Sequence, residues 1–80
     1  MKSLKDILYY IVKSLVDNPD EVNITGLEKN GETVFEVRVA QSDMGKIIGR
    51  QGRVIKSIRT LARAASAYVG GSRIEVEVVD

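Results

Sequence analysis

The fold of this chain is decided by residues 44–58, which read Met44-Gly45-Lys46-Ile47-Ile48-Gly49-Arg50-Gln51-Gly52-Arg53-Val54-Ile55-Lys56-Ser57-Ile58. Two glycines separate a short apolar helix pattern from a longer basic one. Glycine has no Cβ atom, so Gly49 can end the first helix in a left-handed conformation, and Gly52 can let another backbone come close as the second helix begins. The free N–H groups and the dipole of that second helix would face the loop and favour an anion there.

The positive charge of the chain is concentrated around this loop. The net charge of the 80 residues is only +1, yet the segment from Met44 to Ile74 contains no carboxylate. Its cations are Lys46, Arg50, Arg53, Lys56, Arg59, Arg63 and Arg73. A solvated helix face usually alternates in sign, so a face of one sign indicates an anionic partner.

An amphipathic helix is predicted over residues 3–17, because aliphatic residues recur there at three- and four-residue spacing. Ser3 and Asp6 form a weak version of a capping box at its start. Tyr9 and Tyr10 widen the apolar surface beyond one stripe. They are interpreted as half-buried side chains, and a partner-binding edge remains open as the alternative.

Three strands are predicted, over residues 22–27, 33–39 and 73–79. Asn30-Gly31, the strongest short hairpin signal, joins the first two strands, and Gly26 is interpreted as a bulge. The middle strand would direct Phe35, Val37 and Val39 toward the helices and leave Val34, Glu36 and Arg38 on an open face.

Two helices are predicted between the second and third strands. Residues 44–48 would form a short helix capped by Ser42 or Asp43, and residues 53–69 a long one. The buried stripe of the long helix is predicted to contain Val54, Ile58, Leu61, Ala65 and Tyr68, with Ile55, Ala62 and Val69 alongside. Because parallel strands need such a crossover, the second and third strands should be parallel, with the hairpin strand outside them. The order helix, strand, strand, helix, helix, strand therefore predicts an α+β fold with a three-stranded mixed sheet covered by helices on one face.

The run Ile47-Ile48-Gly49-Arg50-Gln51-Gly52-Arg53-Val54-Ile55 resembles the Ile-Gly-x-x-Gly-x-x-Ile signature of KH domains. KH domains bind single-stranded nucleic acid, and in that family the loop that contains the two glycines clamps the backbone of about four nucleotides. The element order resembles the type II, or prokaryotic, KH topology over nearly the whole chain. We therefore expect a single KH domain over residues 1–80, with the N-terminal helix over 3–17 and a KH core over about 30–79.

The length, the N-terminal helix and the run from Gly45 to Arg53 are similar to those of the KhpA family, small bacterial RNA-binding proteins with a single KH domain. The resemblance implies an RNA chaperone or post-transcriptional regulator linked to cell elongation, cell shape and wall synthesis. It also implies a larger KH protein such as KhpB as a partner. We expect a homodimer, or a heterodimer with such a protein, because pairing compensates for the weak binding of one small groove and the helix is rich in alanine over residues 62–67. The alternative is a KH fold that serves as a protein-interaction or dimerisation module with little RNA binding of its own.

The candidate RNA-binding residues lie in the loop and at the two helix ends beside it. They are Lys46, Ile47, Ile48, Gly49, Arg50, Gln51, Gly52, Arg53 and Lys56. The cations and the loop amides would hold phosphates, and the bases would rest on an aliphatic floor next to the last strand. One of the two isoleucines is expected to lie in the core instead. Arg59 and Arg73 are expected to contribute only as distant, screened charges.

Other classes of function fit less well. The chain has no Cys and no His, which excludes disulfides, thiolate or imidazole metal sites and the usual nucleophile–base pairs. The glycine pair is not the Gly-x-x-x-x-Gly-Lys-Ser/Thr phosphate loop, so we expect no catalytic residue, metal, cofactor or small-molecule substrate. A DNA-binding helix-turn-helix is disfavoured by the flanking hairpin. No apolar run reaches membrane-spanning length and the N-terminus lacks a signal-peptide core, so a cytoplasmic protein without a membrane partner is expected.

Overall fold

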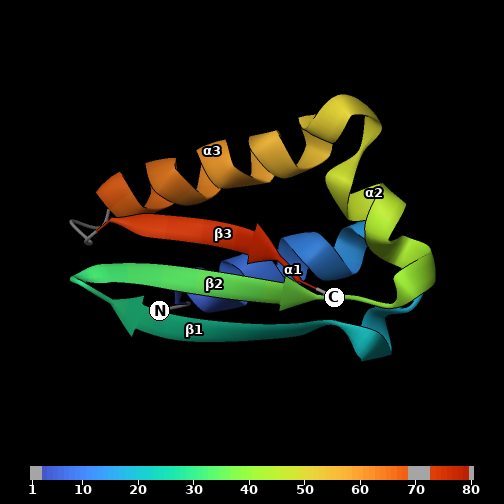
Figure 1. Cartoon of the computed structure of the whole chain (residues 1–80), viewed down its shortest axis with the longest axis horizontal. Helices are drawn as coiled ribbons and strands as arrows, with labels where there is room; N and C mark the ends of the chain where they lie inside the picture. Colours follow the sequence, from blue (N-terminus) through green and yellow to red (C-terminus); the bar gives the residue numbers. More distant parts are fainter. Residues whose placement is uncertain (1–2, 69–72, 80) are drawn as a thin grey trace.

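The computed structural model describes residues 3–68 and 73–79 (Figure 1). Its elements are α1 (Leu4–Leu15), the 3₁₀ turn η1 (Pro19–Glu21), β1 (Asn23–Lys29), β2 (Glu32–Arg38), η2 (Gln41–Asp43), α2 (Met44–Ile48), η3 (Arg50–Gly52), α3 (Arg53–Tyr68) and β3 (Ile74–Val78). Figure 1 shows α1 behind the three strands and α3 running along β3, so that the other face of the sheet is open. The predicted fold class and element order are confirmed.

The first helix, α1, begins at the predicted capping box and ends two residues earlier than predicted. The Ser3 Oγ accepts a hydrogen bond from the Asp6 N–H at 3.2 Å, and the Asp6 carboxylate accepts one from the Ser3 N–H at 3.4 Å. Leu8 and Val12 are fully buried against the sheet and α3. Val16 is already extended, with φ −105° and ψ 160°. The backbone amides that follow it are therefore free to bond outside the helix.

The strands β1 and β2 form an antiparallel hairpin around Asn30-Gly31, as predicted. Asn30 has φ 51° and Gly31 has φ 77°, the positive values that a type I′ turn requires. The pairing runs without interruption along both strands, so the predicted bulge at Gly26 is wrong. Gly26 lies opposite Phe35, and a Cβ atom at Gly26 would come within 3.3 Å of the Phe35 ring. The glycine makes room for the aromatic ring.

The last strand, β3, pairs in parallel with β2, so the sheet order is β1-β2-β3 and the hairpin strand lies at one edge, as predicted. One side chain on the open face differs from the prediction. Val34 was expected to face solvent, yet it is 7% exposed. Its neighbours across the sheet, Leu27 on β1 and Glu75 on β3, cover it.

The buried stripe of α3 is rotated about the helix axis relative to the prediction. The buried residues of this helix are Ile55, Ile58, Ala62 and Ser66. Leu61 and Tyr68, both predicted to be buried, are 57% and 92% exposed. Apolar residues with helical spacing occupy two adjoining faces of α3, so periodicity alone did not identify the face that packs on the sheet. The predicted contribution of Val69 lies outside the described residues.

A buried carboxylate joins the end of α1 to the start of α2. Asp43 is 0% exposed, and it accepts hydrogen bonds from the Asp17 N–H at 3.1 Å, the Asn18 N–H at 3.0 Å and the Asn18 Nδ2 at 3.1 Å. It was predicted as a possible cap for α2 but makes no capping bond to that helix. Since η2 leads directly into α2, the Met44 N–H donates to the Gln41 carbonyl instead. Asp43 therefore fixes α2 against the end of α1.

The environment of Asp43 favours its charged form. Burial raises the pKa of Asp43, but the hydrogen bonds from Asp17 and Asn18 and the nearby charge of Lys46 outweigh this effect and hold the pKa below its usual value of 3.8. A carboxyl whose pKa is lowered by folding stabilises the fold above its unfolded-state pKa. This stabilisation is lost as the pH falls through the folded-state pKa.

We expect Asp43→Asn to lower the midpoint of thermal unfolding at neutral pH by about 5 °C or more, because the amide nitrogen cannot accept bonds from backbone N–H groups. The difference from wild type should shrink as the pH falls below 3.8, where the wild-type carboxyl also becomes protonated. Circular dichroism melts across the acid range measure both effects. Asp20→Asn, which changes an exposed carboxylate in η1, is the control. Equal midpoints for wild type and Asp43→Asn at neutral pH would contradict the anchoring role.

Candidate nucleic-acid interface

The glycine loop forms a sharp corner between α2 and α3. Gly49 ends α2 with φ 76° and ψ 174°, and its N–H donates to the Gly45 carbonyl at 2.8 Å. This is not the left-handed helical conformation predicted for Gly49, because ψ is extended, but it is a region that essentially only glycine adopts. Gln51, with φ 57°, and Gly52, with φ 73°, also have positive φ. The corner therefore depends on backbone conformations that most residues avoid.

The close approach that was predicted at Gly52 occurs at Gly49. A Cβ atom on Gly49 would lie 2.8 Å from the Val54 Cβ and 2.9 Å from the Val54 nitrogen. A Cβ atom on Gly52 would meet only Ile55, at 4.0 Å. Packing and conformation both require glycine at position 49, whereas conformation alone favours it at position 52.

The tip of the loop presents hydrogen-bond donors. The Gly52 N–H donates to the Gly49 carbonyl at 3.2 Å, and the Arg53 N–H donates to the Arg50 carbonyl. Within residues 3–68 and 73–79, the backbone N–H groups of Arg50 and Gln51 have no hydrogen-bond acceptor. The side chains of both residues are exposed, and the Arg53 Nη2 donates to the Gln51 Oε1 at 3.4 Å. These donors lie at the positive end of the α3 dipole, where an anion is favoured.

The four predicted phosphate-binding cations are not equivalent. The Lys46 Nζ lies 3.0 Å from the Asp17 Oδ2 and 3.9 Å from the Asp43 Oδ1. The hydrogen bond and the charge of Asp17 raise the pKa of Lys46 above its usual value, and desolvation opposes them only in part. The charge of Lys46 is thus largely balanced by these carboxylates. The other three cations, Arg50, Arg53 and Lys56, form no ion pair in the part of the chain that the structure describes.

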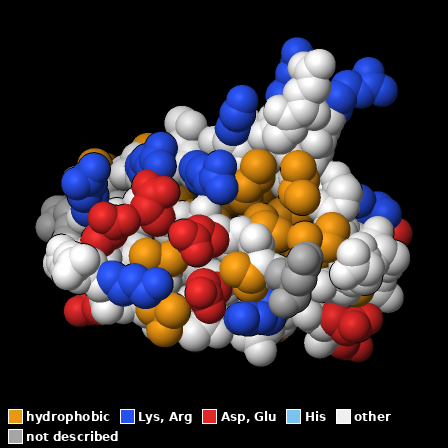
Figure 2. Space-filling view, viewed as in Figure 1, with side chains coloured by type: hydrophobic (Ala, Val, Ile, Leu, Met, Phe, Trp, Pro, Cys, Tyr) orange, Lys and Arg blue, Asp and Glu red, His pale blue; other side chains and the backbone are white. Residues whose placement is uncertain are grey.

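The two isoleucines of the motif have different surroundings. Ile47 is 0% exposed and belongs to the hydrophobic core, so it is removed from the candidate contacts. Ile48 is 38% exposed at the end of α2. Figure 2 shows hydrophobic side chains gathered below the corner of α2 and α3, toward the end of β3, with Lys and Arg side chains above them. Val54 and Val78, which are partly buried, contribute further aliphatic surface on these elements.

Arg59 has a role that the sequence did not reveal. It was predicted as a distant, screened charge, yet it is half-buried and its Nε donates to the Val76 carbonyl at 3.0 Å. One turn further along α3, the Arg63 Nη2 lies 2.6 Å from the Glu75 Oε1. These two contacts fasten α3 to β3. The four-residue spacing of Arg59 and Arg63 indicated that they lie on the same side of the helix. It could not predict that Arg59 bonds to a backbone carbonyl.

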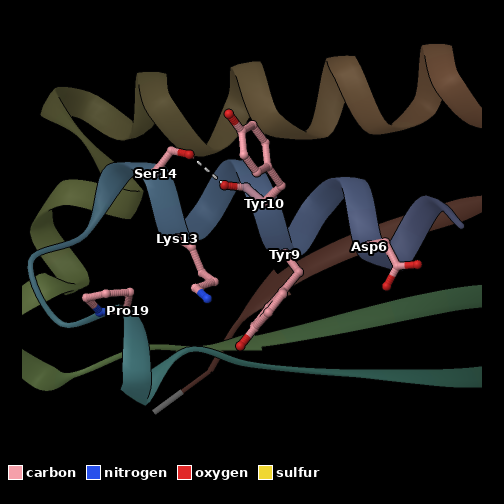
Figure 3. Close-up of a pocket in the computed structure, with 6 residues that line it drawn as sticks. All are labelled: Asp6, Tyr9, Tyr10, Lys13, Ser14 and Pro19. Carbon is pink, nitrogen blue, oxygen red and sulfur yellow. Dashed lines mark hydrogen bonds between the residues drawn. The ribbon is translucent and has the colours of Figure 1, made fainter. Parts of the chain in front are cut away.

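The tyrosines of α1 belong to a separate, open cavity (Figure 3). It is lined by Asp6, Tyr9, Tyr10, Lys13, Ser14 and Pro19. The Lys13 Nζ lies 5.0 Å from the centre of the Tyr9 ring, and the Ser14 Oγ donates to the Tyr10 carbonyl at 2.8 Å. Figure 3 shows the two tyrosine rings pointing in different directions, so they do not form a joint platform for stacking. Tyr9 is 37% exposed and Tyr10 is 72% exposed.

Among residues 3–68 and 73–79, no group of three or more carboxylates is placed to hold a metal ion. Over the same residues, no helix has the length and apolar character needed to cross a bilayer.

A family model described as the KH domain of KhpA/KhpB matches residues 5–78. The chain belongs to the KhpA/KhpB KH-domain family. Its relatives include proteins named RNA-binding protein KhpA from three bacteria. That of Chlamydia caviae is 52% identical over 96% of this chain and 97% of the relative, and that of Borreliella burgdorferi is 47% identical over 94% and 90%. The KhpA of Aquifex aeolicus is 39% identical over the full length of both chains.

Two crystal structures of Era have a fold similar to that of this KH domain. Aquifex aeolicus Era bound to GDP and AlF4⁻ aligns with a TM-score of 0.69 and 20% identity, over 94% of this chain and 29% of the Era chain. Era in complex with MgGDPNP and nucleotides 1506–1542 of 16S ribosomal RNA aligns with a TM-score of 0.64 and 21% identity, over 95% and 30%. At this identity the likeness concerns the fold alone.

We expect Gly49→Ala to lower the free energy of unfolding by about 2–4 kcal/mol, because the methyl group would overlap Val54 and the residue would keep a positive φ. Urea denaturation measures the loss. Gly45→Ala is the matched control, since a Cβ atom at this α2 position meets nothing within 4 Å. It should leave the stability unchanged or raise it by up to about 1 kcal/mol. Equal stabilities for the two variants would show that the corner does not need this contact.

Proposed function

We propose that this KH domain binds single-stranded RNA and holds its phosphate backbone at the Gly49–Gly52 loop. One observation carries the proposal. The loop tip and the start of α3 combine two backbone N–H groups that lack an acceptor in the described chain with three cations, Arg50, Arg53 and Lys56, that lack a carboxylate partner there. Such a combination suits the repeated negative charges of a polynucleotide. The relatives named RNA-binding protein KhpA support the same proposal.

The affinity of one domain for RNA should be modest. None of the four aromatic residues of the chain lies in the loop, so base stacking worth about 1–3 kcal/mol per base contributes little there. Ile48 and the neighbouring aliphatic surface offer the bases an apolar contact instead. Electrostatic attraction to the backbone is therefore the main source of affinity, and binding should weaken as salt is added.

The cellular role proposed here is that of a cytoplasmic, non-catalytic RNA chaperone or post-transcriptional regulator connected with cell elongation and wall synthesis. This proposal is supported by membership of the KhpA/KhpB KH-domain family. A major-groove role for α3 is disfavoured, because Arg59 and Arg63 are bonded to β3 along one side of that helix.

We expect replacement of both Arg50 and Gln51 by Asp to weaken binding of a short single-stranded RNA by at least about tenfold at low salt, because carboxylates would repel the phosphates. Fluorescence anisotropy across a salt series should give a log–log slope near −2 for wild type, for about three neutralised phosphates. The matched control replaces Lys29 and Asn30 by Asp. It changes the net charge equally at the hairpin turn, which lies at the opposite end of the domain (Figure 1).

Two outcomes would contradict this mode of binding. In the first, the loop variant binds RNA as tightly as wild type. In the second, the hairpin variant loses as much affinity as the loop variant, which would mean that only the net charge matters. Far-ultraviolet circular dichroism establishes that both variants are folded.

We further propose that two copies of the domain associate through an apolar face formed by α1 and α3. A small groove between these helices is lined only by aliphatic side chains, which are Leu4, Ile7, Leu8, Ile11, Ile58, Leu61, Ala62 and Ala65. Two of these residues, Ile7 and Leu61, are 41% and 57% exposed, and Tyr10 on α1 is 72% exposed. The small residues Ala64 and Ala67 allow another helix to come close.

A second copy fits this face because an apolar patch is complementary to itself across a twofold axis. The patch lies toward the C-terminal half of α3, so both loops would remain accessible and could hold one RNA together. A larger KhpB-like protein with the same domain type is the other candidate partner, and mixing the two proteins would reveal it.

Leu61→Glu should weaken self-association by at least about tenfold, because it places a carboxylate in the apolar face. The fold should be retained, since Leu61 is already 57% exposed. Sedimentation velocity at high micromolar concentration, with and without RNA, measures the effect. Thr60→Glu, on the adjoining face of α3, is the control. A wild-type protein that sediments as a monomer under both conditions would refute self-association.

A further inference from the structure

The strand β3 pairs with β2 along one edge and has no strand partner along its other edge, which is called the free edge below. The Arg73 carbonyl accepts a hydrogen bond from the Thr33 N–H at 2.9 Å, and the Val79 N–H donates to the Val37 carbonyl at 3.0 Å. Alternate residues of a parallel strand bond to the same neighbour, so the odd-numbered residues of β3 bond to β2. The polar backbone groups of Ile74, Val76 and Val78 therefore point to the free edge, beside α3.

Arg59 occupies the middle of this edge and keeps most of its own donors free. Its Nε donates to the Val76 carbonyl at 3.0 Å. Its two Nη groups have no partner within residues 3–68 and 73–79. The guanidinium group is planar and the side chain is half-buried, so this one bond limits the orientations of the remaining N–H groups.

The position of Arg59 differs from that of the other cations of α3. Lys56, one turn nearer the loop, is exposed, and Arg63, one turn farther, is paired with Glu75. Arg59 is half-buried between α3 and β3, the two elements that flank the hydrophobic surface seen in Figure 2. An RNA backbone held at the loop would run past the exposed cations, and its bases would turn toward that hydrophobic surface.

We propose that Arg59 is a specificity-determining residue, which selects guanine and cytosine over adenine and uracil at one position of the bound RNA. This inference rests on the proposed RNA-binding function. The two Nη groups form a fork of adjacent donors, which matches two adjacent acceptors. Guanine offers O6 and N7, and cytosine offers O2 and N3. Neither adenine nor uracil has two adjacent acceptors on one edge, so these bases cannot satisfy both arms of the fork.

The test compares wild type with Arg59→Lys and Arg63→Lys. Lysine keeps the positive charge but cannot make a two-pronged contact, and Arg63 is the matched control because it lies on the same side of α3 with its charge already paired. Fluorescence anisotropy measures the binding of four uridine heptamers that carry uracil, adenine, cytosine or guanine at the central position. Each titration is repeated over a salt series.

Wild type should bind the cytosine and guanine heptamers at least about fivefold more tightly than the other two. Arg59→Lys should reduce this preference to less than about twofold and leave the salt slope unchanged, whereas Arg63→Lys should retain the preference. A contact to phosphate instead would weaken all four complexes equally and reduce the salt slope by about 1, which would overturn the proposal.

The comparison of the four RNAs with wild type needs no variant, so it can overturn the proposal even if Arg59→Lys fails to fold. Equal binding of all four RNAs by wild type overturns the role of Arg59 but leaves the RNA-binding function standing. Failure to bind any of them overturns the function itself. The two failures are therefore distinguishable.

Discussion

The buried carboxylate of Asp43 is the contact on which the candidate site depends. The helix that leads into the glycine loop, α2, has only five residues and cannot be stable by itself. Asp43 binds it to the backbone after α1, and Ile47 inserts into the core from the same helix. Contact between Gly49 and Val54 then sets the turn into α3, and Arg59 and Arg63 hold α3 on β3. Each of these contacts fixes the position of the next element. The orientation of the loop amides therefore depends on residues that lie far from them in the sequence.

Most of the fold was predictable because its signals are local. The Asn30-Gly31 turn and the alternating strands each depend on residues that are neighbours in the chain, and the length of the crossover implied the parallel pair. The errors concern long-range packing. Gly26 accommodates the ring of Phe35 on the next strand, and Asp43 binds amides that precede it by about 25 residues. On α3, the exposure of Leu61 could not be predicted, because the sequence does not show which of the two apolar faces packs on the sheet.

The position of the loop, its need for glycine and its exposed cations were predictable from the motif. The exact backbone conformation of Gly49 and the pairing of individual side chains were not. Lys46 lies in the motif but is partly neutralised by Asp17 from the end of α1. Arg59 lies outside it and is held on the edge of β3. A sum of charges along the sequence treats these residues alike, although one is balanced by carboxylates and the other retains free donors. At the loop tip and the start of α3, the cations that form no ion pair within residues 3–68 and 73–79 are Arg50, Arg53 and Lys56.

The central strand β2 has a near neighbour in the chain on one side and a distant one on the other. The pairing of β2 with β1 closes a two-residue turn. The pairing of β2 with β3, in which Thr33 lies opposite Ile74, closes a much longer loop that contains both crossover helices. The loss of chain entropy is small for the first step and larger for the second. The hairpin can therefore form early during folding, and the docking of β3 should belong to the slow phase. The partners of Arg59 and Arg63 both lie on β3. The contact surface between α3 and β3 is therefore among the last parts of the domain to form.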